Sequence, residues 1–183
     1  MLQPKDITDY YINKYVCEND TAIDATMGNG FDTLKLALKV GRGGKVYSFD
    51  VQNIAVENTK KLLLENNISN VDLILDSHSN MDKYVSESVK CVIFNLGYLP
   101  GGDHNLQTKK ETTICAIEKS LDILSDKGFI SVCVYYGKNS GTEEKEAVME
   151  YLKGLDHKKY TVLVLDFFNR PNNPPLNVII TKN

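Results

Sequence analysis

Residues 21–38, TAIDATMGNGFDTLKLAL, place acidic side chains on both sides of a glycine turn. Asp24 ends a short apolar run, Gly28 and Gly30 form the turn, and Asp32 opens a segment of helical pattern. The two glycines lack the Cβ atoms that would keep a ligand away from the backbone. Because negative charge repels phosphates and attracts cations, the turn suits a ligand that carries an ammonium group.

The glycine spacing differs from that of a dinucleotide-binding fingerprint. The pattern G-x-G-x-x-G uses its third glycine to pack helix closely on strand, and that position is Thr33 in this chain. A glycine pair after a strand is also a common way for a chain to turn tightly. The turn alone therefore has two interpretations, a ligand site and a plain connection.

A second acidic residue stands at the end of the next predicted strand. Residues 45–51, KVYSFDV, predict this strand, and Asp50 follows Gly30 by 20 residues. At this interval an acid at the end of a second parallel strand reaches the ribose hydroxyls of a nucleotide-like ligand, whereas the competing interpretation is a helix cap. Gln52 follows and presents its amide to the same ligand.

Polar clusters also follow two later apolar runs. Residues 71–76 lead into the polar stretch 76–80, and residues 91–94 lead into Asn95 and Tyr98. Ligands of open α/β sheets bind at such strand ends. The first cluster either reads an adenine edge or caps the following loop. In the second, the Asn95 oxygen accepts a hydrogen bond from a reacting amine and the Tyr98 ring stacks on a base, unless the two residues only cap and pack.

The hydrophobic pattern predicts one α/β domain over residues 1–183. Five predicted strands alternate with helices, and two more near the C-terminus pair antiparallel around a proline-rich connection. A dehydrogenase domain would keep its last strand parallel. Among the predicted elements are helices over 6–16, 54–66 and 108–124, a turn at 126–128, a strand over 129–136, and a helix that begins with a capping box of Ser140 and Glu143.

Composition narrows the function classes. No run is long and apolar enough to span a bilayer, and the N-terminus lacks the order of a signal peptide, so we expect a cytoplasmic protein without a membrane partner. The net charge of −3 gives no overall attraction to nucleic acid, although Lys109, Lys110 and Arg170 could meet phosphates locally.

The cysteines and histidines favour neither metal binding nor covalent catalysis. The cysteines are widely spaced, form no C-x-x-C pair, and are expected to be buried thiols: Cys17, Cys91, Cys115 and Cys133. Covalent catalysis by cysteine needs an attacking thiolate, which a buried thiol rarely forms. The three histidines are not grouped with the cysteines, so we expect no metal site.

Five segments, taken together, resemble a family of small bacterial class I methyltransferases long described as rRNA methylases. The segments are DATMGNGFDT at 24–33, FDVQ at 49–52, DSHSNM at 76–81, NLGYLPGGDH at 95–104 and NRPNNPPL at 169–176. The first two are shared with many methyltransferases, and the last two are more specific. The resemblance implies a three-layer Rossmann-like class I methyltransferase fold, with a seven-stranded, mostly parallel sheet and an antiparallel C-terminal strand.

The resemblance also implies a cofactor and its site. The cofactor is S-adenosylmethionine (SAM), which carries an ammonium, a sulfonium and no phosphate, and the product is S-adenosylhomocysteine (SAH). The implied cofactor-binding residues are Asn29, Gly30, Asp32, Asp50, Gln52, Ser77 and His78, to which the acidic glycine turn adds Asp24 and Gly28. Asn95 and Tyr98 occupy the place of the N-P-P-Y segment of amino-group methyltransferases, with Leu96 and Gly97 instead of the two prolines.

Family members are associated with methylating 5-aminomethyl-2-thiouridine at the tRNA wobble position, which implies N-methylation with the anticodon region of tRNA as partner. Asn95, Tyr98 and Asp103 are candidates to orient or deprotonate the amine. Three alternatives stay open: an rRNA methyltransferase, an N-methyltransferase of a small molecule or protein, and a nucleotide-binding module or dehydrogenase. A homodimer through the apolar C-terminal hairpin and the N-terminal tyrosines is compatible with the pattern.

Overall fold

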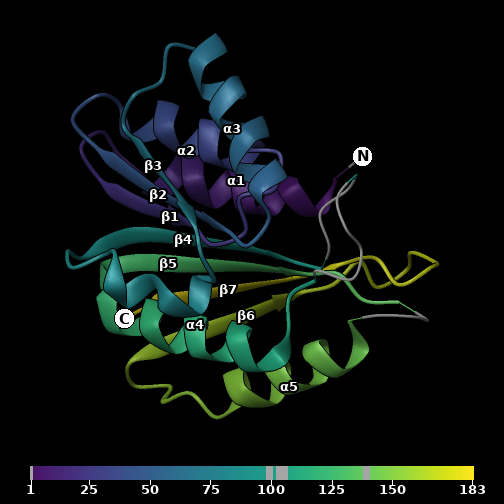
Figure 1. Cartoon of the computed structure of the whole chain (residues 1–183). Helices are drawn as coiled ribbons and strands as arrows, with labels where there is room; N and C mark the ends of the chain where they lie inside the picture. The colour runs from purple at the N-terminus through teal and green to yellow at the C-terminus, as the bar shows by residue number, and fades with distance from the viewer. Residues whose placement is uncertain (1, 98–100, 102–106, 138–140) are drawn as a thin grey trace.

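The computed structural model describes residues 2–97, 101, 107–137 and 141–183. Within these residues, helices and strands alternate along most of the chain (Figure 1). The helices are α1 (Pro4–Tyr15), α2 (Phe31–Val40), α3 (Asn53–Glu65), the 3-10 helix η1 (His78–Lys83), α4 (Lys110–Ile123) and α5 (Thr142–Lys153). The strands are β1 (Thr21–Asp24), β2 (Lys45–Asp50), β3 (Val71–Leu75), β4 (Val89–Leu96), β5 (Leu124–Val134), β6 (Tyr160–Leu165) and β7 (Leu176–Lys182).

The strands of the described residues form one seven-stranded sheet in the order β3-β2-β1-β4-β5-β7-β6. Strands β1 to β5 run parallel, and β7 runs antiparallel to both β5 and β6. The predicted fold class and C-terminal hairpin are thereby confirmed. Because β6 has the same direction as β5, six strands end at one edge of the sheet, which we call the carboxyl edge.

Helices cover both faces of the sheet. In Figure 1, α1, α2 and α3 lie on one side of the strands, and α4 and α5 lie on the other. The first side packs Ile12 and Leu36 on Cys91 and Ile93, and the second side packs a larger cluster that includes Ile117 and Val148. Among the described residues, no helix is both long and apolar enough to cross a membrane.

Strand β4 is longer than the sequence predicts. It was expected over 91–94, but it runs from Val89 to Leu96 because Asn95 and Leu96 continue the pairing with Cys133 and Val134 of β5. Asn95 therefore lies in the paired part of β4 and not in the loop that follows it. A strand position holds its backbone more firmly than a loop would.

Two other predicted boundaries are wrong. The predicted turn at 126–128 is a bulge inside β5, since the register with β4 shifts between Val89 and Cys91 and Lys127 has φ +56°. Helix α5 begins after Gly141, which has φ +79° and stands at the N-cap position that the predicted capping box gave to Ser140. Ser140 itself lies outside the described residues.

Gly30 is required by the protein itself. It has φ +81°, and a Cβ atom built on it would lie 2.6 Å from Thr59 Oγ1 of α3. The sequence suggested that the missing Cβ makes room for a ligand, but the group that occupies this space is a threonine side chain. The glycine therefore allows the start of α2 to approach α3 closely.

We expect Gly30→Ala to lower the free energy of unfolding by about 2–5 kcal/mol. A left-handed alanine costs roughly 1–2 kcal/mol, and overpacking against Thr59 adds about 1–3 kcal/mol. Urea denaturation measures the loss. Gly101→Ala is the matched control, because Gly101 has φ +83° with nothing within 4 Å of its added Cβ. Equal losses in the two variants would contradict the clash.

Candidate functional site

A buried carboxylate lies beneath the glycine turn. Asp24 at the end of β1 is fully buried, and its Oδ2 accepts a hydrogen bond of 2.6 Å from Thr33 Oγ1 in the first turn of α2. The Thr33 hydroxyl is also 2.6 Å from Ser48 Oγ of β2. Asp24 Oδ1 accepts the Thr26 N–H at 3.2 Å. These bonds tie two strands and a helix to one carboxyl group.

The environment of Asp24 favours its protonated form. Burial raises the pKa of the Asp24 carboxyl to about 7, and the nearby charge of Asp32 adds to the rise. The recorded partners of this carboxyl are protein groups, namely a hydroxyl and a backbone N–H. Asp24 thus stabilises the glycine turn through Thr26 and Thr33 on its two sides.

Asp50 holds the glycine turn from the end of β2. Its Oδ2 accepts the Gly28 N–H at 3.0 Å, and its Oδ1 accepts the Gln52 N–H at 2.9 Å. Helix α3 begins only at Asn53, with Gln52 as its N-cap residue, so Asp50 does not fill the N-cap position. Two backbone donors leave further lone pairs on a carboxylate, which has about four acceptor sites.

Asp32 connects the turn to β4. Its Oδ2 accepts a 2.9 Å hydrogen bond from Asn95 Nδ2, and its Oδ1 forms a 3.1 Å ion pair with Lys35 Nζ. Lys35 also pairs with Asp9 of α1. The backbone N–H of Asn95 donates to Thr26 Oγ1 at 2.7 Å. Two residues that the sequence assigned to cofactor and to catalysis are therefore in direct contact.

His78 is held in one tautomer. Its Nδ1 is 2.9 Å from the Ala25 carbonyl oxygen, which can only accept, so Nδ1 carries the proton and Nε2 is the acceptor. Burial lowers the pKa of His78, which favours the neutral ring. Nε2 is buried and has no hydrogen-bond partner within the part of the chain that the structure describes.

The neighbouring Ser77 caps η1, since its Oγ accepts the Ser79 N–H at 3.2 Å and lies 2.8 Å from Ser79 Oγ. The capping interpretation of this cluster therefore holds for Ser77. Asn29 Oδ1 accepts from Asn58 Nδ2 at 3.2 Å, and Gln52 is buried.

The predicted catalytic residues Tyr98 and Asp103 lie outside the described residues. Sequence reasoning missed the roles of Thr26, Thr33 and Ser48, which bind the predicted site residues. Thr33 had a signal, because it stands where a dinucleotide fingerprint has its third glycine. Its hydroxyl bonds to Asp24 at that position, which explains why a glycine is absent.

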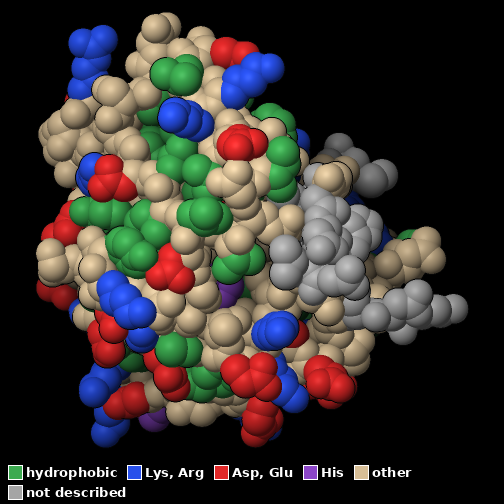
Figure 2. Space-filling view, viewed as in Figure 1, with side chains coloured by type: hydrophobic (Ala, Val, Ile, Leu, Met, Phe, Trp, Pro, Cys, Tyr) green, Lys and Arg blue, Asp and Glu red, His purple; other side chains and the backbone are tan. Residues whose placement is uncertain are grey.

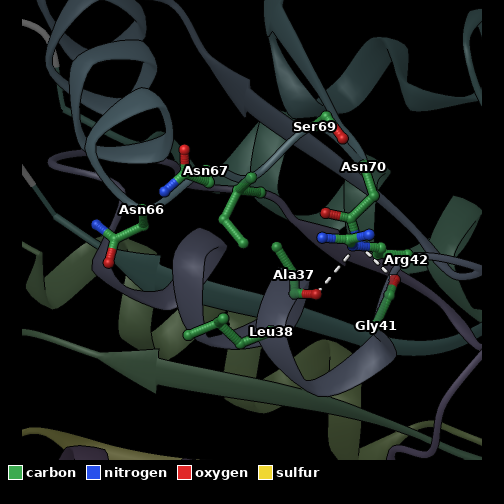
Figure 3. Close-up of a pocket in the computed structure, with 9 residues that line it drawn as sticks. Ala37, Leu38, Gly41, Arg42, Asn66, Asn67, Ser69 and Asn70 are labelled. Atoms are coloured by element: carbon green, nitrogen blue, oxygen red, sulfur yellow. Dashed lines mark hydrogen bonds between the residues drawn. The ribbon is translucent and has the colours of Figure 1, made fainter.

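A separate hollow of about 320 Å³ lies at the other end of α2. Figure 3 shows the residues that line it. Its lining comes from the last turn of α2 and from residues 66–70. Asn70 Nδ2 donates to the carbonyl oxygens of Ala37 and Gly41 at 3.1 and 2.8 Å, and so satisfies the C-terminal end of α2. This hollow precedes β2 and β3, so it lies away from the carboxyl edge.

The cysteines are only partly as predicted. Cys91 and Cys133 are buried, whereas Cys115 is half-buried and Cys17 is exposed, so the prediction is wrong for Cys17. Burial raises the pKa of Cys133 to about 12 and that of Cys91 well above its usual range. Neither buried thiol forms the thiolate that nucleophilic catalysis needs.

The mixed sheet and the acidic glycine turn define a class I methyltransferase, the class that uses SAM. The family model described as "Putative rRNA methylase" matches residues 46–181, and the chain belongs to this family. The cofactor, fold class and family that the sequence predicted are confirmed by these comparisons.

Three relatives make the similarity specific. A "putative rRNA-methylase" from Clostridium thermocellum is 48% identical with a TM-score of 0.98, and the match covers 100% of this chain and 99% of that one. A "putative methyltransferase" from Streptococcus mutans, solved in complex with SAH, is 41% identical with a TM-score of 0.92 over 100% of this chain and 99% of that one.

The third relative is the chloroplastic tRNA (mnm(5)s(2)U34)-methyltransferase of Arabidopsis thaliana, which is 41% identical over 170 residues. This match covers 87% of the chain but only 62% of the length of the plant protein.

The raised pKa of Asp24 predicts a pH-dependent stability. Between about pH 4 and pH 7 the folded state keeps a proton that the unfolded state releases, so this group makes the wild type less stable as pH rises through that window. We expect the stability of cofactor-free Asp24→Asn relative to wild type to increase by about 2–4 kcal/mol from pH 4 to pH 7, measured by urea denaturation.

The control for this prediction is Asp72→Asn, because the Asp72 side chain is 50% exposed in its ion pair with Lys45. We expect a much smaller change with pH in that variant. A relative stability of Asp24→Asn that stays constant across the window would show that Asp24 ionises normally in the folded protein.

Proposed function

We propose that this chain transfers a methyl group from SAM to the amine of 5-aminomethyl-2-thiouridine at the wobble position of tRNA. The products are 5-methylaminomethyl-2-thiouridine and SAH. The plant tRNA methyltransferase supports this substrate by its 41% identity. The observation that carries the proposal is the hydrogen bond from Asn95 Nδ2 to Asp32. It leaves the Asn95 Oδ1 as an acceptor for an amine N–H.

The residues at the carboxyl edge fit SAM. SAM supplies a methyl group on a positively charged sulfonium. Asp32 places a carboxylate at the start of α2, where Asn95 and Lys35 hold it, and Asp50 is fixed by two backbone N–H groups with acceptor capacity to spare for ribose hydroxyls. The buried Nε2 of His78, which lacks a partner among the described residues, is a further acceptor for a ligand donor.

Asn95 orients the amine. Its Nδ2 donates to the Asp32 carboxylate, so the amide is fixed with Oδ1 as its accepting end. Oδ1 accepts a hydrogen bond from the amine N–H and aims the nitrogen lone pair at the methyl group. Such positioning can account for much of the rate acceleration when the enzyme holds the reacting atoms roughly 3–3.5 Å apart.

An alkyl amine is mostly protonated at neutral pH and must lose a proton before it attacks. Asp103 is proposed to take that proton, and Tyr98 to stack on the base. Attack by nitrogen is also supported by the cysteines, since the raised pKa values of Cys91 and Cys133 keep these buried groups as neutral thiols.

The description of the family favours rRNA as a second candidate substrate. Mass spectrometry of nucleosides from a deletion strain separates the two candidates. Loss of 5-methylaminomethyl-2-thiouridine from tRNA, with accumulation of the unmethylated amine, supports the tRNA proposal. Unchanged tRNA together with the loss of a methylated rRNA nucleoside would refute it. Complementation with the Asn95→Ala gene controls for effects of the deletion other than methylation.

Asp50→Asn tests the cofactor site. We expect the Kd for SAH to rise about 10- to 100-fold, because the asparagine amide cannot accept both backbone hydrogen bonds and a charged acceptor is lost. Isothermal titration calorimetry gives the Kd. Asp72→Asn on β3 removes a carboxylate away from the carboxyl edge and should change the Kd by less than twofold. An unaltered Kd in Asp50→Asn would remove Asp50 from the site.

Asn95→Ala tests the positioning of the amine. We expect kcat to fall about 100-fold, because misplacement of reacting groups by about 1 Å costs on that order. The Kd for SAH should change by less than threefold. Asn66→Ala at the end of α3 is the control and should leave kcat within twofold. If Asn95→Ala kept the wild-type kcat, another residue would have to orient the amine.

A further inference from the structure

Of the six phenylalanines of this chain, Phe167 is half-buried and the other five are either fully buried or largely exposed. Phe49, Phe94 and Phe129 are fully buried in the core, as expected for large apolar side chains. Phe168 is 97% exposed and Phe31 is 70% exposed. A fully exposed phenylalanine gains nothing from burial on folding. Single exposed apolar side chains are common on protein surfaces, but the exposure of Phe168 leaves a whole aromatic ring available for contact with a ligand.

The two exposed phenylalanines stand at the same edge of the sheet. Phe31 is the first residue of α2 and follows the glycine turn directly. Phe168 lies in the connection between β6 and β7, which leaves the sheet where β6 ends and extends from the molecule in Figure 1 (yellow). Four strand spacings separate β1 from β6 in the sheet order, or roughly 19 Å at about 4.8 Å each.

Close to Phe168 in the sequence, a cation lies over an aromatic ring. The guanidinium carbon of Arg170 lies 4.0 Å from the centroid of the Phe167 ring. Its Nη2 donates to the Leu2 carbonyl oxygen at 2.5 Å. Within the described residues, no carboxylate forms an ion pair with Arg170. The sequence suggested a phosphate contact for this arginine, and the structure places its guanidinium group over an aromatic ring.

We propose that the β6–β7 connection, with exposed Phe168 beside Arg170 stacked on Phe167, is a platform on which an unpaired base of the RNA substrate stacks. Phe31, which directly follows the glycine turn, is a second stacking side chain. This inference rests on the proposed function, because it requires a single-stranded RNA segment at the carboxyl edge. A base fits both surfaces, since aromatic rings and guanidinium planes stack on any base.

The charge of the protein favours a contact that does not depend on long-range attraction to phosphates. The net charge is −3, and Figure 2 shows Lys and Arg side chains interspersed with Asp and Glu on the face it presents. Long-range attraction to phosphates is therefore weak. Stacking does not depend on net charge, so the exposed rings and Arg170 can supply affinity for RNA at the carboxyl edge.

The test compares Phe168→Ala with wild type in the full chain. We expect the Kd for unmethylated tRNA to rise about 5- to 150-fold, which corresponds to the roughly 1–3 kcal/mol of a stacked base. The Kd for SAH should stay within twofold. Phe168→Tyr should restore tRNA binding because it keeps the ring. Leu64→Ala is the control, since Leu64 is 67% exposed on α3 and lies at the far end from the glycine turn.

Arg170→Lys separates stacking from phosphate binding. Lysine keeps the charge but lacks the planar group, so a stacked arginine predicts weaker tRNA binding with an unchanged salt dependence. If Arg170→Lys binds tRNA normally while Arg170→Ala lowers the slope of log Kd against log salt, Arg170 contacts a phosphate and its part in the platform is refuted.

Other outcomes would overturn the proposal in a recognisable way. An unchanged Kd for tRNA in Phe168→Ala refutes the platform but leaves the methylation of tRNA intact. If analytical ultracentrifugation shows that Phe168→Ala dissociates a dimer without affecting RNA binding, Phe168 contacts a second copy of the chain and the platform is again refuted. If wild-type protein does not methylate tRNA, the proposed function fails, and binding of a single-stranded oligonucleotide still reports on the platform.

Discussion

The site depends on a carboxyl group that is buried and accepts a hydrogen bond on each of its oxygens. Asp24 joins β1 to α2 through Thr33 and, through the same hydroxyl, to Ser48 of β2. An unpaired carboxyl in this position would cost several kcal/mol, so the glycine turn and the first turn of α2 must keep their places to satisfy it. Asp50 fixes the other side of the turn through the Gly28 N–H.

A second set of contacts connects the glycine turn to Asn95, the residue proposed to orient the amine. Asp32 stands at the start of α2, where the fixed turn places it, and from there it bonds both Lys35 and Asn95. Two contacts fix the backbone of Asn95. It is paired within β4, and its N–H donates to Thr26 Oγ1. The arrangement suits a reaction in which the protein mainly positions the reactants.

The sequence predicts more of the fold than of the site. Alternation of apolar strands with helices is a local pattern, and it correctly gave the parallel strands and the antiparallel hairpin. It failed where pairing overrides local preference, as at Lys127, whose turn-like segment is a bulge in β5. The spacing of Asp50 from Gly30 placed that acid beside the glycine turn, but did not show that its oxygens hold Gly28 and Gln52.

By itself, the sequence determined which side chains are available for chemistry and which strand ends carry them. It could do so because hydrophobic periodicity and turn signals depend on residues that are close together in the sequence. Only the tertiary structure decided which carboxyl is buried, which tautomer His78 adopts, and that Asn95 meets Asp32 across 63 residues of chain. The physical reason is that burial and hydrogen bonding depend on how helices pack on the sheet. Local patterns do not contain the distance between two side chains that only packing brings together.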